Sequence, residues 1–232
     1  MGAVATQSFV NVSFGRRGLD LLKAGKSPQE ALDELLSTDE GRDFRQVAII
    51  DKNGRVAAHT GKLCIRDASH IVGENFSVQA NMMLNDKVVP AMAEAFKNSH
   101  GHLAERMVEA LKVAQKAGGD IRGQQSASIL VVRGESTGNE WEDRVIDLRV
   151  EDHENAIDEV ERLLKVYRAY EHMNAGDLAI EKGDEAKALY EYQSAGEMFP
   201  EHLEMKYLPP AVGGLSRGGL VCRLLSQYRT PG

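Results

Sequence analysis

Hydrophobic and polar positions alternate along much of the chain with the two-residue period of β-strands. An apolar run at residues 3–10 predicts a first, buried strand. Residues 46–51 and 55–60 flank an Asn53-Gly54 turn, and this arrangement is typical of a β-hairpin. Two more strands are predicted at 128–132 and 144–150. Apolar and charged residues alternate in the second, which indicates a half-buried strand antiparallel to the first.

Helical spacing of apolar residues marks the segments between these strands. A short pattern at 18–25 ends at a glycine, and Ser27 with Glu30 then forms the capping box of a second helix. A third helix is predicted after Asp86, and a fourth runs from Leu103 to the glycines at 118–119. Between residues 60 and 81 the pattern is irregular and unusually polar. Because strands and helices alternate in blocks, the sequence predicts an α+β fold with an antiparallel-rich sheet layered with helices.

Beyond residue 152 the pattern is helical only. Residues 154–168 are charged and periodic, and residues 169–201 match one tetratricopeptide-type repeat (TPR) of two helices. The matching small, aromatic and terminating positions are Gly176, Ala188, Tyr192, Ala195 and Pro200. A single repeat cannot bury its own face, so it is expected to pack on the preceding helix, on the main domain or on a second chain. The predicted divisions are a domain at 1–153, a helical extension at 154–206 and an irregular basic tail at 207–232.

Composition and charge exclude several classes of protein. The formal net charge is -7, and no stripe of basic residues with interleaved aromatics occurs, so a general nucleic-acid binder is not expected. No apolar run approaches the roughly 20 residues of a membrane span. Two cysteines, Cys64 and Cys222, give no disulfide framework, and a cytoplasmic location is therefore expected.

The glycine-rich loop at 118–127 carries the most suggestive group of polar residues, and two interpretations of it remain open. In one, the glycines cap a helix and an Asp120–Arg122 pair only braces the turn. In the other, the loop holds Asp120, Arg122, Gln125 and Ser126 toward a ligand, with Arg122 pairing with a carboxylate.

Other chemistry has weaker support in the sequence. Cys64 with His70 is one candidate nucleophile–base pair, although an apolar-flanked cysteine is more often a small core residue. His100 and His102 have metal-like spacing beside Glu105, but no third ligand is evident. Ser126 has no base beside it. The sequence contains no P-loop, dinucleotide-binding or zincin motif, and no metal or cofactor is predicted.

Several stretches together resemble DUF1028, a bacterial domain of unknown function placed in the N-terminal nucleophile (Ntn) hydrolase superfamily. The resemblance covers roughly residues 2–153. The residues that carry it are 2–7, Gly15, Gly18, Leu19, Asp51, Gly54, Thr60, Gly61, Cys64, His70, Gly73, Phe76, Gln79, Asn81, Ala91, Met92, the loop 117–127 and the strand end 147–150. Some members also carry a C-terminal helical extension like residues 168–201.

This resemblance implies an αββα sandwich, in which two sheets lie face to face between helix layers, together with a TPR-like helical hairpin. It also implies hydrolysis of an amide bond in a small molecule or peptide. In Ntn chemistry the nucleophile is an N-terminal Thr, Ser or Cys activated by its own α-amine, and backbone N–H groups stabilise the oxyanion. The residues expected to line the pocket are His70, Gln79, Asn81, Asp120, Arg122, Gln125 and Ser126.

The start of the chain differs from the family pattern. Members open with a further strand pair that begins on a Thr directly after the initiator Met, whereas Gly2 follows Met1 here. The expectation is therefore an N-terminally truncated, incomplete sandwich that lacks its nucleophile and is inactive in this form. The alternative is a non-catalytic interaction or assembly module. It would use the helical repeat and an exposed sheet edge to bind a protein partner or to form a homo-oligomer.

Overall fold

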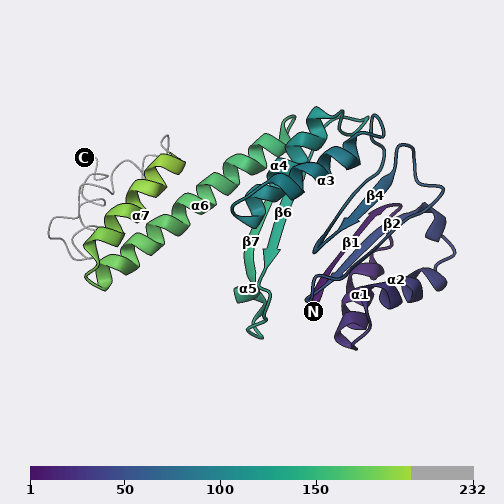
Figure 1. Cartoon of the computed structure of the whole chain (residues 1–232), viewed down its shortest axis with the longest axis horizontal. Coiled ribbons are helices and arrows are strands. Elements are labelled where there is room, and N and C mark those ends of the chain that lie inside the picture. The colour runs from purple at the N-terminus through teal and green to yellow at the C-terminus, as the bar shows by residue number, and fades with distance from the viewer. Residues whose placement is uncertain (200–232) are drawn as a thin grey trace, which may run out of the picture. The chain divides into compact units, whose positions relative to one another are not determined.

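The computed structural model describes residues 1–199 (Figure 1). Contacts within the chain define two compact units, Met1–Val160 and Glu161–Gly232. The described part is a mixed α+β structure with small antiparallel sheets, as the block pattern of strands and helices predicts. No helix among residues 1–199 is both long and apolar enough to span a membrane.

The first unit begins with a three-stranded antiparallel sheet. Its strands are β1 (Gly2–Ser8), β2 (Arg45–Asp51) and β3 (Val56–Thr60), and β2 lies in the centre. This confirms the predicted hairpin around Asn53-Gly54, whose tip is held by the Asp51 carboxylate accepting the N–H groups of Asn53 and Arg55. A short 3₁₀ helix, η1 (Arg42–Phe44), leads into β2.

Two helices, α1 (Ser13–Lys23) and α2 (Pro28–Ser37), cover one face of this sheet (Figure 1). The predicted capping box at the start of α2 is present, because Ser27 and Glu30 each accept the other's backbone N–H. The core between the helices and the sheet consists of Phe14, Leu22, Ala31, Leu32, Leu35, Val47, Ile49 and Ala57. Since neighbouring residues of a strand point to opposite faces, Gln46 and Ala48 of β2 point away from these helices.

Residues 60–81, where the sequence pattern is irregular, contain a second β-hairpin. It consists of β4 (Ser69–Gly73) and β5 (Phe76–Ala80), with Asn75 in the turn at a φ of 62°. Val78 and Ala80 of this hairpin pack against Val89 and Ala93 of α3 (Val88–Asn98). Helix α4 (Leu103–Lys116) lies beside α3 (Figure 1).

The third sheet confirms the last predicted strand pair. It joins β6 (Ala127–Val132) and β7 (Arg144–Val150) antiparallel, with an irregular register between Val131 and Val132. A single-turn helix, α5 (Glu140–Asp143), lies between the two strands in the sequence. Ile129 and Ile146 are the most buried side chains of this sheet.

The C-terminal elements are α6 (Ala156–Glu181) and α7 (Glu185–Met198), which form a helical hairpin. The segments 154–168 and 169–181, which the sequence pattern treats separately, are one continuous helix apart from the first two residues. Ala188, Tyr192 and Ala195 are buried between the two helices as expected from their spacing. Pro200 and the predicted tail at 207–232 lie outside the described residues.

Close approach of the two helices depends on Gly176. A Cβ atom at this position would lie 2.5 Å from Cε1 of Tyr192, whose hydroxyl donates to the Asp177 carboxylate at 2.7 Å. That hydrogen bond and the packing of the ring leave the tyrosine little freedom to move aside. The carboxylate and the burial of the phenol both raise the pKa of Tyr192, with burial the larger cause.

We predict that Gly176→Ala destabilises the hairpin by about 1–3 kcal/mol, because overpacking a close contact costs more than the gain in helix propensity. Gly15→Ala is the matched control, since that glycine is also helical but a Cβ atom added there would meet no neighbouring group within 4 Å. It should stabilise the chain by about 0.5–1 kcal/mol. Thermal unfolding followed by circular dichroism checks both values. Equal effects of the two substitutions would contradict the assigned packing.

Candidate functional site

The most buried polar side chain in the described residues is Gln46, which is 0% exposed. Its Nε2 lies 3.0 Å from Thr60 Oγ1, 3.1 Å from the Ser69 carbonyl oxygen and 2.9 Å from the Ala80 carbonyl oxygen. Its Oε1 accepts a hydrogen bond from Asn81 Nδ2 at 3.0 Å. Because an amide buried without partners is costly, these bonds hold the β4–β5 hairpin against the first sheet.

The hydrogen-bond network continues from Gln46 through Thr60 to His70. The Thr60 hydroxyl lies 2.8 Å from His70 Nδ1 and 3.0 Å from Gln46 Nε2, and it donates to the imidazole in the tautomer whose proton is on Nε2. Burial, and secondarily the charge of His59, lower the pKa of His70, which favours the neutral ring.

Further polar side chains extend the network across the strands. Gln7 of β1 is the cross-strand neighbour of Gln46, and Gln79 is the neighbour of His70. Gln79 Oε1 accepts from the Ser77 hydroxyl at 2.9 Å, and Gln7 Oε1 is buried with no hydrogen-bond partner in the described structure. We call this set the amide row; it consists of Gln7, Gln46, Thr60, His70, Gln79 and Asn81.

The amide row offers neutral hydrogen-bonding groups and no charge. Apart from Gln46 its members are only partly buried, although the Gln7 Oε1 atom itself is buried. Asn81 Nδ2 uses one hydrogen on Gln46 and has a second, and His70 has a further donor in its Nε2-protonated tautomer. Such donors can bind the carbonyl oxygen of an amide. Three of the seven residues expected to line a pocket, His70, Gln79 and Asn81, belong to this row.

The glycine-rich loop is held by the segment that follows β5. Gly118 and Gly119 have φ values of 135° and 62°, which favour glycine, and the Gly119 carbonyl accepts the Leu84 N–H at 2.9 Å. Ile121 N–H bonds to the Met82 carbonyl at 3.0 Å, and Asp120 forms a β-bridge with Met83. Backbone hydrogen bonds therefore fix the position of this loop.

Asp120 and Arg122 pair with each other within this loop. Arg122 donates from Nε and Nη2 to the two Asp120 carboxylate oxygens, at 2.9 Å and 2.6 Å. Its backbone N–H also donates to Oδ1 at 2.8 Å. The Arg122 guanidinium lowers the pKa of Asp120, which in turn raises the pKa of Arg122. This geometry favours the brace over the ligand-holding interpretation of the pair.

The last two expected residues, Gln125 and Ser126, are exposed. The Gln125 carbonyl accepts the His153 N–H at 2.8 Å, and the neighbouring Gln124 side chain accepts the Ile157 N–H at the start of α6. The loop residue that contacts another element through its side chain is thus Gln124, which the sequence pattern does not single out.

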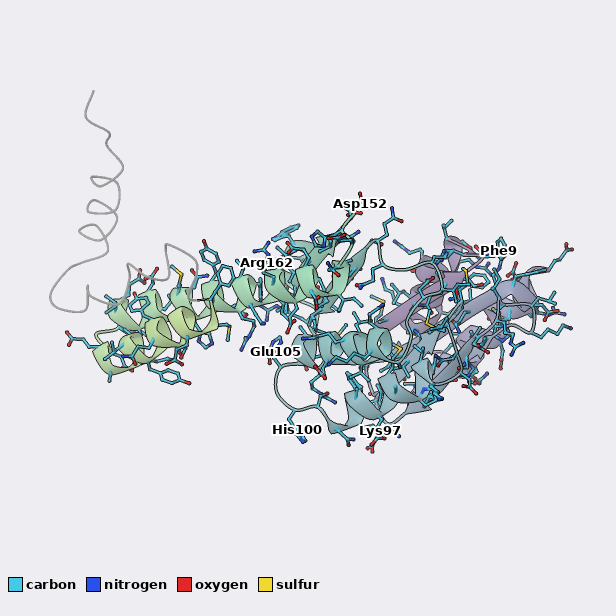
Figure 2. All side chains as sticks on the ribbon, turned by 90° about the horizontal axis from the view of Figure 1, so that it is seen from above. Phe9, Lys97, His100, Glu105, Asp152 and Arg162 are labelled. Carbon is cyan, nitrogen blue, oxygen red and sulfur yellow. The ribbon has the colours of Figure 1, made fainter. Side chains whose placement is uncertain are left out.

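The candidate nucleophile Cys64 and the candidate metal ligands His102 and Glu105 form hydrogen bonds that stabilise the fold. Cys64 Sγ donates to the Arg45 carbonyl at 3.4 Å, while His70 is bonded to Thr60, so the two do not form a nucleophile–base pair. His102 and Glu105 form the capping box of α4, and His100 lies in the preceding loop (Figure 2). Among the described residues, no three His, Cys, Asp or Glu side chains are grouped for a metal ion.

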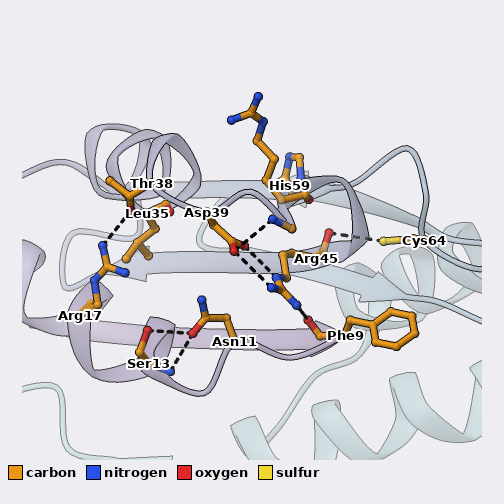
Figure 3. Close-up of polar contacts among 12 residues, drawn as sticks. Phe9, Asn11, Ser13, Arg17, Leu35, Thr38, Asp39, Arg45, His59 and Cys64 are labelled. Carbon is orange, nitrogen blue, oxygen red and sulfur yellow. Dashed lines mark hydrogen bonds and ion pairs between the residues drawn. The ribbon is translucent and has the colours of Figure 1, made fainter.

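An ion pair fixes the start of β2, next to Gln46 of the amide row (Figure 3). Arg45, directly before Gln46, donates from Nε to Asp39 Oδ2 at 2.8 Å and also donates to the Phe9 carbonyl. Both partners are largely shielded, with side-chain exposures of 18% and 11%. Hydrogen bonding from Arg45 lowers the pKa of Asp39. The pair ties β1, β2 and the α2–η1 connection together at this end of the sheet.

We predict that Gln46→Leu lowers the free energy of unfolding by about 2–4 kcal/mol, because it leaves the Asn81 amide and two backbone carbonyls without their partner. Gln29→Leu is the control, since Gln29 is exposed on α2 and its side chain donates to Asp33 one turn along the same helix. That change should stay within about 0.5 kcal/mol. Urea unfolding measures both, and a Gln46→Leu chain as stable as the control would contradict the network.

The lowered pKa of His70 predicts a pH effect on stability. As the pH falls from 7 through the ordinary histidine value of 6.5, the unfolded chain takes up a proton at this ring while the folded chain does not. Stability is therefore lost on acidification until the pH reaches the lower pKa of the folded state. His70→Gln should flatten the dependence of melting temperature on pH between about 7 and 5. An unchanged slope would contradict the neutral assignment.

Two comparisons place the chain among known proteins. The model of a family of unknown function (DUF1028) matches residues 1–160. The crystal structure of protein SPO2555 from Silicibacter pomeroyi, itself assigned to the DUF1028 family model, is similar at 28% sequence identity with a TM-score of 0.62. This similarity covers 71% of the present chain and 69% of that chain. No curated protein matches the sequence. The chain belongs to the DUF1028 family of unknown function.

Proposed function

We propose that the amide row is the substrate site of a hydrolase that cleaves an amide bond in the manner of Ntn hydrolases. The observation that carries the proposal is the row itself, a line of uncharged amide and imidazole groups held in place by the buried Gln46 carboxamide. Carboxamides recognise amides through complementary donors and acceptors. The reaction class comes from the resemblance to DUF1028, a family placed among the Ntn hydrolases.

In this proposal the substrate carbonyl oxygen lies near Asn81 and His70. The free Nδ2 hydrogen of Asn81 and the Nε2–H of His70 would donate to that oxygen as negative charge develops on it. A neutral His70 suits this role, because a ring that is already protonated would bind free anions as well.

Ntn chemistry assigns the nucleophile to an N-terminal Thr, Ser or Cys. Its side-chain oxygen or sulfur bonds to the carbonyl carbon, its α-amine takes the proton, and the amine product leaves with that proton before water cleaves the acyl intermediate. The family fold that accompanies this chemistry is an αββα sandwich. The helix-covered three-stranded sheet, with the amide row on its opposite face, supports assigning the first unit to that fold.

A second function, protein binding by a TPR-like α6–α7 hairpin, is supported by exposed apolar side chains. Leu178, Leu189 and Tyr190 are 54%, 40% and 65% exposed, although the hairpin has its own buried seam. Apolar side chains exposed on the outside of a helical pair are typical of surfaces that contact other proteins.

We predict that Asn81→Ala and His70→Ala each weaken binding of an amide ligand by about tenfold, because each removes one hydrogen-bond donor worth about 1 kcal/mol. The measurement uses the full chain with a library of primary carboxamides and dipeptides, and it monitors release of ammonia or amine. Ligand-observed NMR on the same library reports binding separately.

Arg122→Ala is the control for these variants. The Arg122 guanidinium is engaged with Asp120, so its removal should leave amide binding unchanged. Amide binding that is lost in the Asn81 variant, with no turnover by any chain, would support the substrate class and reject hydrolysis by this polypeptide. Absence of both binding and turnover would reject the proposal.

A further inference from the structure

The tip of the β2–β3 hairpin contains the one Asn-Gly pair in the sequence, Asn53-Gly54. Asn53 is exposed to solvent. Asparagine is among the chemically labile residues of proteins, and it is most labile before glycine. Glycine has no Cβ atom to hinder attack by its own backbone nitrogen on the asparagine carboxamide. This position therefore combines a reactive pair of residues with access to water.

The fold holds the reacting groups through hydrogen bonds to Asp51. The Gly54 N–H donates to the Asp51 carbonyl oxygen at 3.0 Å. The N–H groups of Asn53 and Arg55 both donate to Asp51 Oδ1, each at 2.9 Å. Every backbone N–H from Asn53 to Arg55 is thus bonded to Asp51, and these bonds fix the peptide planes on both sides of the Gly54 nitrogen.

The Asp51 carboxylate is itself held in place. Its side chain is only 7% exposed, and its Oδ2 accepts from Arg55 Nε at 2.7 Å. On the other side of the tip, Asn75 from the β4–β5 turn packs against Gly54. Its Oδ1 atom occupies the space in which a Cβ atom on Gly54 would lie. Both contacts restrict movement of the Asn53–Gly54 peptide.

We propose that Asn53 is a site of deamidation and isoaspartate formation, and that the Asp51 carboxylate suppresses this reaction in the folded chain. The Gly54 nitrogen loses its proton and bonds to Asn53 Cγ, and the carboxamide nitrogen leaves with that proton as ammonia. Water then opens the cyclic imide at one of its two carbonyl carbons. Opening at the main-chain carbonyl gives isoaspartate, whose backbone runs through Cβ and Cγ, and opening at Cγ gives aspartate.

The folded turn withholds the geometry that this reaction needs. The Gly54 nitrogen reaches Asn53 Cγ only after its N–H leaves the Asp51 carbonyl and the peptide rotates. The same rotation pulls the neighbouring N–H groups away from Asp51 Oδ1. Leaving a buried carboxylate without its donors is costly. The hairpin tip must therefore open before the chemistry begins, and the free energy of that local opening limits the rate.

The two products differ in their effect on the fold. Isoaspartate lengthens the backbone of the turn by one carbon, which moves Gly54 away from Asn75 and breaks the paired bonds to Asp51 Oδ1. Aspartate keeps the backbone length and these bonds. The isoaspartate form should therefore melt at a lower temperature than the aspartate form, although their masses are equal. Thermal unfolding of the two chromatographically separated forms measures this difference, and equal melting temperatures would contradict the assigned contacts.

The test of the proposal is the rate at which Asn53 converts in the full chain at mildly alkaline pH. Peptide mass spectrometry with electron-transfer fragmentation measures both products. Asp51→Ala should raise the rate in the folded chain at least about tenfold, because it removes hydrogen bonds to a charged acceptor that oppose opening. The unsubstituted chain unfolded in urea should also convert at least about tenfold faster than the folded chain. Asn53→Gln is the matched control, which keeps a carboxamide but disfavours ring closure and should not convert.

Hydrogen exchange of the Gly54 N–H in the unsubstituted chain measures the same opening without relying on a variant that must fold. Its protection should be of the same order as the factor by which folding slows conversion. A folded chain that converts as fast as the unfolded chain, or a folded Asp51→Ala chain that converts no faster, would overturn the role of Asp51. An Asn53 that stays intact in both the folded and the unfolded chain would overturn the modification site.

Discussion

The first unit depends on the burial of one carboxamide. Gln46 has no exposed surface, and its hydrogen-bond partners come from β3, from β4 and from the end of β5. Removing an amide from water is favourable only when protein groups replace every lost hydrogen bond. The three-stranded sheet and the β4–β5 hairpin must therefore be correctly placed together. The Gln46 side chain can therefore be buried only when the β4–β5 hairpin is in its correct position.

The hydrogen bonds of Gln46 also fix the orientation of the neighbouring polar side chains. Asn81 is oriented by Gln46 Oε1, and His70 is oriented through the Thr60 hydroxyl. Such supporting contacts fix the rotamer and the tautomer of a group before any ligand arrives, which is the usual basis of preorganisation in functional sites. Arg45 adds rigidity directly beside Gln46, because its guanidinium joins the start of β2 both to Asp39 and to the Phe9 carbonyl at the end of β1.

Local sequence signals predicted local structure well, whereas the site depends on contacts between distant segments. The Asn53-Gly54 turn and the Ser27–Glu30 capping box each act within a few residues, so the hairpin and the start of α2 were predictable. The β4–β5 hairpin was not, because its strands carry polar residues whose partners lie across the fold. Gln46 likewise looks like a polar residue at the start of a strand, and only its contacts with residues 69 and 80 reveal that it is buried. In the glycine-rich loop the pattern indicated the turn, but it could not distinguish an internal Asp120–Arg122 pair from a pair waiting for a ligand.

The charge distribution separates the amide row from the rest of the chain. The protein has a net charge of -7, yet several of its charges near the first sheet and its loops are paired, as at Asp39–Arg45, Asp51–Arg55 and Asp120–Arg122. Paired charges hold loops in place and have little remaining capacity to attract a ligand. Recognition at the row would therefore depend on matching donors to acceptors. A site of this kind rejects a molecule that lacks a matching group, because its own polar atoms would then be left desolvated and unpaired. If the row binds a substrate as proposed, neutral hydrogen-bond recognition would favour selectivity for a particular amide over general attraction to charged molecules.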